Sequence, residues 1–446
     1  MAPTPVRATR RAWRLLPALV VVLAAACNDR NEVLAPTPAS LTPRAAAGGM
    51  PAVTVVGLEP LVDASRNFSE AVDVNDLSQV VGVSAGASGL ERAVIWDNTP
   101  YPIDLGVLDE TSRAYAIGAD GSTIVGTSMS NQQTVAVRWI RPAESWVIDM
   151  LPRYPSATSC TARDVTVDGT IVGDCLVAGV SHAMIWQNGV VRALGLGSAR
   201  SVNAAGQIVG VSATEPVQAL LWTPAGSATA LGTLGGNRSA AFGVDASGHV
   251  VGASDDASGA SRYRAFLWTP KKGMVDLGSL TTSSVAVATN GTQIVGFSEA
   301  APNAAQHATL WQRGKIVDLG VLPGYERSTA SSLNGRGQVV GTSGAFDISR
   351  ATMWTVKWAT GPAAAIEPPP PGSSPHCSRI EQPAPPGLRT PGGGAAPSHL
   401  ATQTDRDRVR VRPLDAGRVQ AADAHDRLQH AAPAALLQRV NADPGG

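Results

Sequence analysis

The chain has 446 residues and carries 35 basic and 35 acidic side chains, so its formal net charge at pH 7 is zero. A balanced charge provides no electrostatic footprint for nucleic acid or for an acidic surface, and we expect no nucleic-acid partner.

Residues 1–27 have the pattern of an export signal. Four arginines between residues 7 and 14 precede an apolar run from Leu15 to Ala26. This run is too short to span a bilayer comfortably. Its end, Ala24-Ala25-Ala26-Cys27, resembles a bacterial lipoprotein signal, whose cysteine is lipidated and becomes the mature N-terminus. The resemblance implies lipid attachment at Cys27 and an anchor in a membrane. Residues 28–50 are rich in Pro, Ala and Thr, which predicts a flexible tether.

Residues 51–358 repeat one pattern seven times. A Val-Gly pair is followed, after eight to twelve residues, by an alanine that stands three positions before a tryptophan. The seven glycines are Gly82, Gly126, Gly173, Gly210, Gly252, Gly296 and Gly341, and the seven tryptophans are Trp96, Trp139, Trp186, Trp222, Trp268, Trp311 and Trp354. The mean period is about 43 residues, and repeats of this length are typical of propellers, solenoids or arrays.

Each repeat is predicted to contain four short strands separated by turns. In the first copy these strands are Ala71–Val74, Gln79–Ser84, Arg92–Trp96 and Pro102–Leu105, and in the sixth they are Val285–Ala288, Gln293–Ser298, His307–Trp311 and Lys315–Leu319. Four strands with their turns need about 40 residues, which is the length of one propeller blade. The prediction is an all-β, seven-bladed β-propeller of four-stranded blades. A β-helical solenoid is disfavoured, because Gly and polar turns interrupt the chain every five or six residues.

The last repeat lacks the fourth strand that ends in Leu-Gly in most other copies. A matching segment, Val53–Val56 followed by Gly57, stands ahead of the first copy. We predict that Val53–Val56 completes the blade of Trp354 and closes the ring, because a propeller must hide the edges of its first and last blades. Thr355–Trp358 is the competing fourth strand.

The repeated residues have structural explanations. One tryptophan per repeat is expected to pack neighbouring blades. The alanine three positions earlier lies on the opposite face of the strand, where a small side chain suits a crowded contact. The Val-Gly glycine indicates a bulge or a close backbone approach.

The composition changes beyond residue 358. Residues 362–446 contain no aromatic residue and no lysine, but nine arginines. We predict that residues 359–446 form a disordered tail, since such a segment buries too little apolar surface to order itself. Translation in a shifted reading frame is a second hypothesis for this composition.

The repeats resemble the bacterial HAF family of probable extracellular repeats, named for a His-Ala-Phe phrase before the tryptophan. The matching triplets include His182-Ala183-Met184 and Arg264-Ala265-Phe266, and Leu231-Gly232-Thr233-Leu234-Gly235-Gly236-Asn237 is close to the family's phrase between repeats. The resemblance implies an exported repeat protein. It implies no activity, so no functional residue is carried over from it.

The sequence contains no nucleophile motif, phosphate loop or metal cluster. Among the histidines of the repeats, His182 and His307 occupy a position that is Arg in other copies, which favours a polar contact at the start of a strand over a metal ligand. Asp120-Gly121-Ser122 is interpreted as a hairpin turn. We therefore expect no catalytic residue, no cofactor and no metal.

Cys160 and Cys175 lie on the first two strands of the third copy, and in an oxidising compartment they could cross-link this hairpin. Cys377 would stay unpaired. The favoured function is a non-catalytic, membrane-tethered monomer that binds protein or glycan through its loop-bearing faces, as a periplasmic or cell-surface lipoprotein or otherwise as a secreted protein. The alternative is a glycan-cleaving hydrolase or lyase with its active site in the pore. Converging, non-repeated Asp, Glu, His or Arg side chains in the pore would favour the enzyme.

Overall fold

The computed structural model describes residues 50–61, 68–143, 145–258, 262–300, 305–345 and 348–358. The predicted signal with Cys27, nearly all of the predicted tether, and the predicted tail with Cys377 lie outside these residues. The regular elements of this described part are all strands, and it contains no helix able to cross a membrane.

The strands follow the repeats in chain order. The first two repeats contain β2 (Ser69–Val74), β3 (Gln79–Ala85), β4 (Glu91–Asp97), β5 (Ile103–Asp104), β6 (Ser112–Ile117), β7 (Thr123–Ser130), β8 (Gln133–Ile140) and β9 (Val147–Met150). The third and fourth contain β10 (Ala157–Val165), β11 (Ile171–Val177), β12 (Val180–Gln187), β13 (Val190–Val202), β14 (Ile208–Ser212), β15 (Ala219–Trp222) and β16 (Ala228–Ala230). The fifth and sixth contain β17 (Gly235–Val244), β18 (Val250–Asp256), β19 (Tyr263–Thr269), β20 (Gly273–Asp276), β21 (Ser284–Thr289), β22 (Ile294–Glu299), β23 (Gln306–Gln312) and β24 (Lys315–Gly320). The seventh contains β25 (Arg327–Leu333), β26 (Gln338–Ala345) and β27 (Ile348–Lys357), and β1 is Ala52–Gly57.

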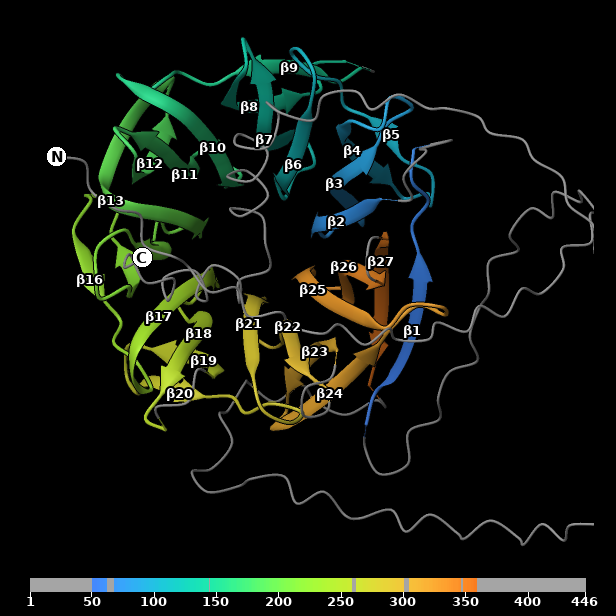
Figure 1. The fold of residues 1–446 in the computed structure, drawn as a ribbon, viewed down its shortest axis with the longest axis vertical. Coiled ribbons are helices and arrows are strands. Elements are labelled where there is room, and N and C mark those ends of the chain that lie inside the picture. Colours follow the sequence, from blue (N-terminus) through green and yellow to red (C-terminus); the bar gives the residue numbers. More distant parts are fainter. Residues whose placement is uncertain are drawn as a thin grey trace, which may run out of the picture. The chain divides into compact units, whose positions relative to one another are not determined.

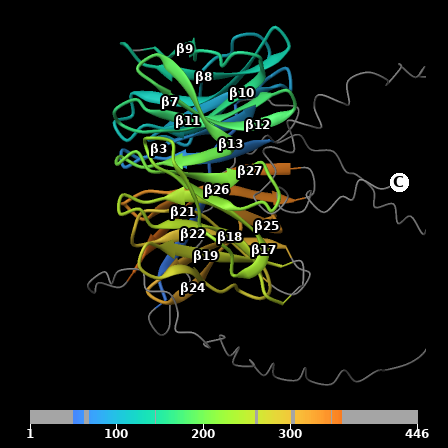
Figure 2. The same ribbon diagram turned by 90° about the vertical axis from the view of Figure 1, so that its left-hand side faces the viewer.

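The sheets are antiparallel and are arranged around a common centre, with the first strand of each repeat innermost (Figure 1). This is the architecture of a β-propeller. Five sheets have four strands, and the sixth runs from β10 to β16 without a break. It is continuous because β13 pairs with β12 up to Leu196 and with β14 from Gly197 onward. Figure 2 shows the same sheets from the side, with β13 toward the viewer.

Each Val-Gly glycine lies opposite a bulge in the innermost strand, as predicted. In the first repeat Gly82 pairs with Ala71, and the register shifts between Ala71 and Asp73. A Cβ atom on Gly82 would lie 2.0 Å from the carbonyl oxygen of Glu70. The other six glycines show the same approach, at 1.9 or 2.0 Å from a backbone oxygen of the neighbouring strand. No other residue type fits this position without displacing the backbone.

The repeated alanines and tryptophans meet between sheets. The alanine of one repeat and the tryptophan of the next share one apolar cluster, as Ala93 and Trp139 do, and Ala351 of the last repeat shares one with Trp96 of the first. The seven alanines are buried, and so are six of the tryptophans. Trp268 departs from the prediction because it is only partly buried. The fully buried ring of Phe266 lies two residues earlier on the same strand face, over Gly252. It belongs to the apolar cluster against which Trp268 packs.

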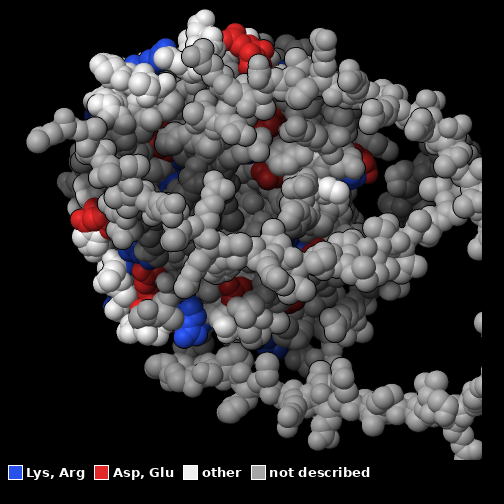
Figure 3. Space-filling model, viewed as in Figure 1, with Lys and Arg blue, Asp and Glu red and all other residues white. Residues whose placement is uncertain are grey.

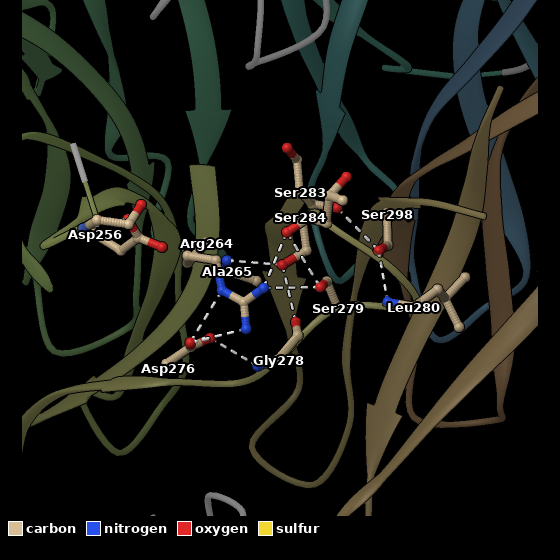
Figure 4. A network of polar contacts seen from close by, with 12 residues as sticks. Asp256, Arg264, Ala265, Asp276, Gly278, Ser279, Leu280, Ser283, Ser284 and Ser298 are labelled. Atoms are coloured by element: carbon tan, nitrogen blue, oxygen red, sulfur yellow. Dashed lines mark hydrogen bonds and ion pairs between the residues drawn. The ribbon is translucent and has the colours of Figure 1, made fainter. Parts of the chain in front are cut away.

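Serines add a second repeated link between sheets. In the contact drawn in Figure 4, the Ser284 hydroxyl accepts the backbone N–H of Ala265 at 3.0 Å and donates to the carbonyl of Gly278 at 2.8 Å. The hydroxyl of Ser69 likewise accepts the N–H of Ala351, at 3.0 Å, and so joins the last repeat to the first. Equivalent bonds to the alanine N–H are made by Ser112, Ser239 and Ser328.

β1 pairs antiparallel with β27 over its full length, with Val55 opposite Trp354. The prediction that Val53–Val56 joins the sheet of Trp354 is therefore confirmed. The competing assignment of Thr355–Trp358 as a fourth strand is wrong, because Thr355 to Lys357 continue β27 itself. Beyond β1, the carboxylate of Glu59 pairs with the guanidinium of Arg350 at 2.6 Å.

Candidate functional site

A cavity of about 500 Å³ lies among the innermost strands, and we call it the central cavity. Its wall includes two consecutive residues of every innermost strand, those that follow the alanine opposite the Val-Gly glycine. The first residues of these pairs are Val72, Tyr115, Arg163, Arg200, Phe242, Val287 and Ser331, and the second are Asp73, Ala116, Asp164, Ser201, Gly243, Ala288 and Ser332. The bulge at this point of each strand explains why two neighbouring residues face the same space.

The wall differs from one side to the other. The first four repeats contribute charged side chains, whereas the fifth to seventh contribute Phe242, Val287 and Phe297 together with small hydroxyl residues. In the space-filling view acidic side chains lie near the centre of the ring as well as at its rim (Figure 3). Residues that vary between repeats therefore surround the central cavity, while the invariant Ala, Gly and Trp hold the sheets together.

Arg113 on β6 is enclosed by two carboxylates. Its guanidinium lies 3.5 Å from Glu70, its Nε donates to Glu91 at 2.6 Å, and it stacks over the ring of Phe68 at 5.8 Å. Burial alone would lower the pKa of Arg113, but the hydrogen bonds that Arg113 donates to Glu91 and the charge of Glu70 raise it. Burial raises the pKa of Glu70, and the opposing charge of Arg113 only partly offsets this. The charge of Arg113 is thus compensated within the protein.

Asp73 and Asp164 occupy equivalent positions and each joins two innermost strands. Asp164 accepts the N–H of Val202, in the next repeat, at 2.8 Å. Asp73 accepts the N–H of Ile117 at 2.9 Å and the hydroxyl of Ser332 at 2.6 Å. Burial raises the pKa of both carboxyls, and repulsion from Asp73 contributes to raising that of Asp164 to about 7.

Arg163 and Arg200 differ in their partners. Arg163 forms an ion pair with Asp174, which also accepts the hydroxyl of Ser198 at 2.7 Å. Burial would raise the pKa of Asp174, but Arg163 and these hydrogen bonds together lower it. The Nε atom of Arg200 is buried and has no hydrogen-bond partner in the described part of the chain. Burial and the adjacent charge of Arg163 lower the pKa of Arg200 to about 9.

The cysteines singled out in the sequence form a disulfide. Cys160 on β10 is opposite Cys175 on β11, with their Cα atoms 4.1 Å apart. Five other repeats have two serines opposite each other at this register position: Ser69 and Ser84, Ser112 and Ser128, Ser239 and Ser254, Ser284 and Ser298, Ser328 and Ser343. The disulfide thus replaces a repeated serine pair between the first two strands of a sheet.

The three histidines of the repeats lie outside the wall of the central cavity and make polar contacts. Nδ1 of His307 lies 2.9 Å from Asp318 and that of His249 2.9 Å from Asp245, while His182 contacts the carbonyl oxygen of Val180 at 3.0 Å. Arginine takes the place of His307 in other repeats and makes the same contact, as Arg264 does with Asp276 (Figure 4). Within the described ranges no three His, Cys, Asp or Glu residues are grouped as a metal site would require.

The Asp120-Gly121-Ser122 sequence of the second repeat forms the hairpin turn expected from it. Asp120 accepts the N–H of Ser122 at 3.1 Å, and Gly121 has a positive φ of 71°. The turn accounts for these residues without a bound ion.

Sequence reasoning did not name the residues of the central cavity. The available signal was the difference between repeats at the two positions after the inner alanine, where Ala162-Arg163-Asp164 and Ala199-Arg200-Ser201 are polar but Ala286-Val287-Ala288 is not. This difference can be interpreted only once the strand register and the bulge are known, because they determine which residues face the central cavity.

The sequence matches no family model and no curated protein sequence. Among solved structures the chain is similar to TolB from Acinetobacter baumannii, with 14% identity, a TM-score of 0.42, and coverage of 63% of this chain and 67% of that one. It is also similar to the β-propeller domain of the Trilobed protease from Pyrococcus furiosus, with 11% identity, a TM-score of 0.46, and coverage of 66% and 98%. A puromycin hydrolase gives 14% identity, a TM-score of 0.49, and coverage of 70% and 57%. These likenesses concern the fold alone, and the assignment of a β-propeller stands on the strand pairing described above.

Proposed function

We propose that this chain is an exported, membrane-tethered and non-catalytic β-propeller that binds a glycan or a protein segment, with the central cavity as its binding site. Its seven repeats form seven four-stranded blades, and β1 closes the ring by serving as the outer strand of the last blade. The observation that carries the proposal is the central cavity, whose wall varies between repeats while the Ala, Gly and Trp positions between the sheets are constant.

The blade count and the closure are supported by the pairing of β13 and β1. Dividing β13 at Gly197 splits the seven-stranded sheet into an outer strand for the third repeat and an inner strand for the fourth. Every blade then has four strands, with β1 as the fourth strand of the last one. The pairing of β1 with β27, and the Ala351 and Trp96 contact, join the last repeat to the first.

Export and tethering are supported by residues 1–27 and by the disulfide. A structural disulfide is typical of proteins in oxidising compartments outside the cytosol. Cys27, at the end of the lipoprotein-like signal, is the proposed lipid attachment site.

Binding is supported by the size and the chemistry of the central cavity. Pockets for small ligands occupy about 300 to 1,000 Å³ and combine apolar walls with a few polar groups. The central cavity has this size, with Phe242 and Val287 on one side and Arg200 and Ser201 on the other. The same features suit one or two sugar units or a short peptide end.

A glycan-cleaving hydrolase or lyase is the second candidate, and one observation favours it. The carboxyl of Asp164 faces the central cavity with a pKa of about 7, a value suited to a general acid or base. Both oxygens of Asp164 nevertheless accept backbone N–H groups, of Val165 and of Val202. This use of both oxygens favours a structural role for the carboxyl, and we place the binding function first.

A binding screen with a paired cleavage assay tests the proposal. The purified protein is incubated with arrays of glycans and peptides, and each captured glycan is analysed afterwards by mass spectrometry. Ser331→Trp fills the central cavity and is expected to abolish capture, whereas Tyr101→Ala, at a side chain that is 69% exposed outside the cavity, should leave capture unchanged. Capture that survives Ser331→Trp would refute the cavity as the site, and shortened glycans would establish the enzyme instead.

A further inference from the structure

The three arginines on the wall of the central cavity differ in how their charge is balanced. Arg113 is paired with two carboxylates, and Arg163 is paired with Asp174. Arg200 forms no ion pair with any described residue, and its buried Nε has no acceptor. The carboxylate of Asp174 is already bound by Arg163 and Ser198. The charge of Asp174 also attracts Arg200, but burial and the repulsion from Arg163 outweigh this attraction, so the charge of Arg200 is only partly balanced within the protein.

Such an arrangement is unfavourable in the empty protein. A buried donor without an acceptor loses its hydration and gains nothing in return, and the loss is larger for a charged group. Arg163 adds repulsion from the neighbouring innermost strand, and the lowered pKa of Arg200 reflects both effects. An anion placed in the central cavity, which Arg200 lines, would balance this charge.

A guanidinium offers a planar fork of donors that matches the two oxygens of a carboxylate. We infer that the central cavity binds a small organic carboxylate, whose carboxylate group is held by Arg200. This inference rests on the proposed binding function and specifies its ligand class.

The rest of the wall defines the body of this ligand. Phe242, Val287 and Phe297 provide an apolar surface, while Tyr115, Ser201 and Ser331 provide hydroxyl groups. A uronic acid unit of a glycan has a carboxylate, hydroxyl edges and an apolar ring face, so it meets all three requirements. An aromatic acid of similar size meets two of them. The shared chemistry is the carboxylate, and the experiment below separates the two sources.

Isothermal titration with four probes tests the inference. Galacturonate is compared with neutral galactose, and phenylacetate is compared with neutral phenylacetamide. The charged member of at least one pair should bind roughly ten- to a hundred-fold more tightly than its neutral partner, as expected for hydrogen bonds to a charged group. A preference confined to galacturonate identifies a sugar acid, and one confined to phenylacetate identifies an apolar acid.

Arg200→Gln should abolish the charge preference without lowering the melting temperature, because the side chain makes no ion pair whose loss could destabilise the fold. The matched control is Arg138→Gln, on β8 outside the cavity wall, where the arginine pairs with Asp149 and its side chain is 43% exposed. This variant should bind like the parent.

The inference is overturned if both members of each pair bind equally, if Arg200→Gln retains the preference, or if none of the probes binds at 10 mM or roughly that concentration. Equal binding of galacturonate and galactose would leave the glycan-binding function standing while removing the carboxylate. A preference for phenylacetate over phenylacetamide, with no binding of either sugar, would support the carboxylate and remove the glycan-binding function.

Discussion

Two kinds of residue stand side by side on each innermost strand. The alanine of each strand, such as Ala286, has no room around it, because it lies opposite a glycine whose Cα touches the strand. The next two residues face the central cavity and are free to change. Packing therefore restricts one position of the repeat to alanine, whereas the two positions after it accept different side chains.

The close approach at the Val-Gly glycine predicts a strong effect of a single methyl group. In Gly296→Ala the new Cβ would lie 2.0 Å from the carbonyl oxygen of Val285, so the two strands must separate. We expect a loss of about 1 to 3 kcal/mol in the free energy of unfolding, measured by urea titration. Gly320→Asn is the control, because Gly320 has open space around it and a positive φ that Asn tolerates. Equal stability of Gly296→Ala and the parent would contradict the register described here.

Asp164 predicts a dependence of stability on pH. Its pKa is about 7 in the folded protein and about 4 in the unfolded chain. Between these values the folded state holds a proton that the unfolded state has released, so this carboxyl reduces stability as the pH rises from about 4 to about 7. Asp164→Asn carries no charge and keeps one oxygen, for the N–H of Val202, while the N–H of Val165 loses its acceptor at every pH.

The melting temperature of Asp164→Asn should therefore rise relative to the parent between pH 4 and pH 8, by several degrees. Asp120→Asn should show no such gain, because hydrogen bonds from Ser122 lower the pKa of Asp120. A constant difference between Asp164→Asn and the parent at all pH values would show that this carboxyl does not titrate in the window.

The sequence predicts the residues of the frame better than those of the candidate site. Trp96, Ala93 and Gly82 recur at fixed spacing, and period and size alone indicate what they do. Arg200 stands at a position that varies between repeats, but the sequence does not show how its charge is balanced. That balance depends on Asp174, Arg163 and burial, and is a property of the three-dimensional arrangement.

Only one of the two faces of β1 packs against the apolar core. Val53 and Val55 pack against the apolar cluster around Trp354, while Thr54 and Val56 are exposed. The alternation follows the period of two residues in a strand. The sequence predicts this strand because Val56-Gly57 matches the apolar residue and glycine that end other fourth strands. The segment nevertheless precedes the first repeat, whereas its partner lies in the last.

This alternation predicts opposite outcomes for neighbouring substitutions. Val55→Asp places a charge against the cluster of Trp354 and should lower the free energy of unfolding by about 2 to 4 kcal/mol. Val56→Asp, on the exposed face, should change it by less than about 0.5 kcal/mol. Thermal unfolding of both variants measures the difference, and equal effects would exclude the pairing of β1 with β27.

At the scale of the whole molecule, the contact between the last and the first repeat uses the same elements as the contacts between consecutive repeats. Ala351 and Trp96 share a cluster, and Ser69 accepts the N–H of Ala351. The amide of Asn334 also donates to the carbonyl of Asn75 at 3.0 Å, just as Asn75 donates to Gly118 at 3.2 Å. A closed ring in which every junction is alike follows from these contacts if the proposed closure holds.

Such a ring predicts that the position of the chain ends matters little. Ala52 is opposite Lys357, so a two-residue Asn-Gly turn can join them. A circular permutant would begin at Phe68, continue through Lys357 and this turn into β1, and end at Leu61. We expect its melting temperature to lie within a few degrees of the parent, measured by circular dichroism. A permutant that fails to fold would contradict the proposed closure.

The pairing of β1 with β27 also bears on the order in which the molecule is completed. Every other sheet is built from strands that follow one another along the chain, so each can form from local contacts as the chain emerges. β1 is made before any of the repeats, yet its partner is the last strand made. Until the final repeat arrives, β1 carries an unpaired edge that a second chain could capture. If the chain is exported as proposed, release of the complete chain before it folds would shorten the time for which this edge is exposed.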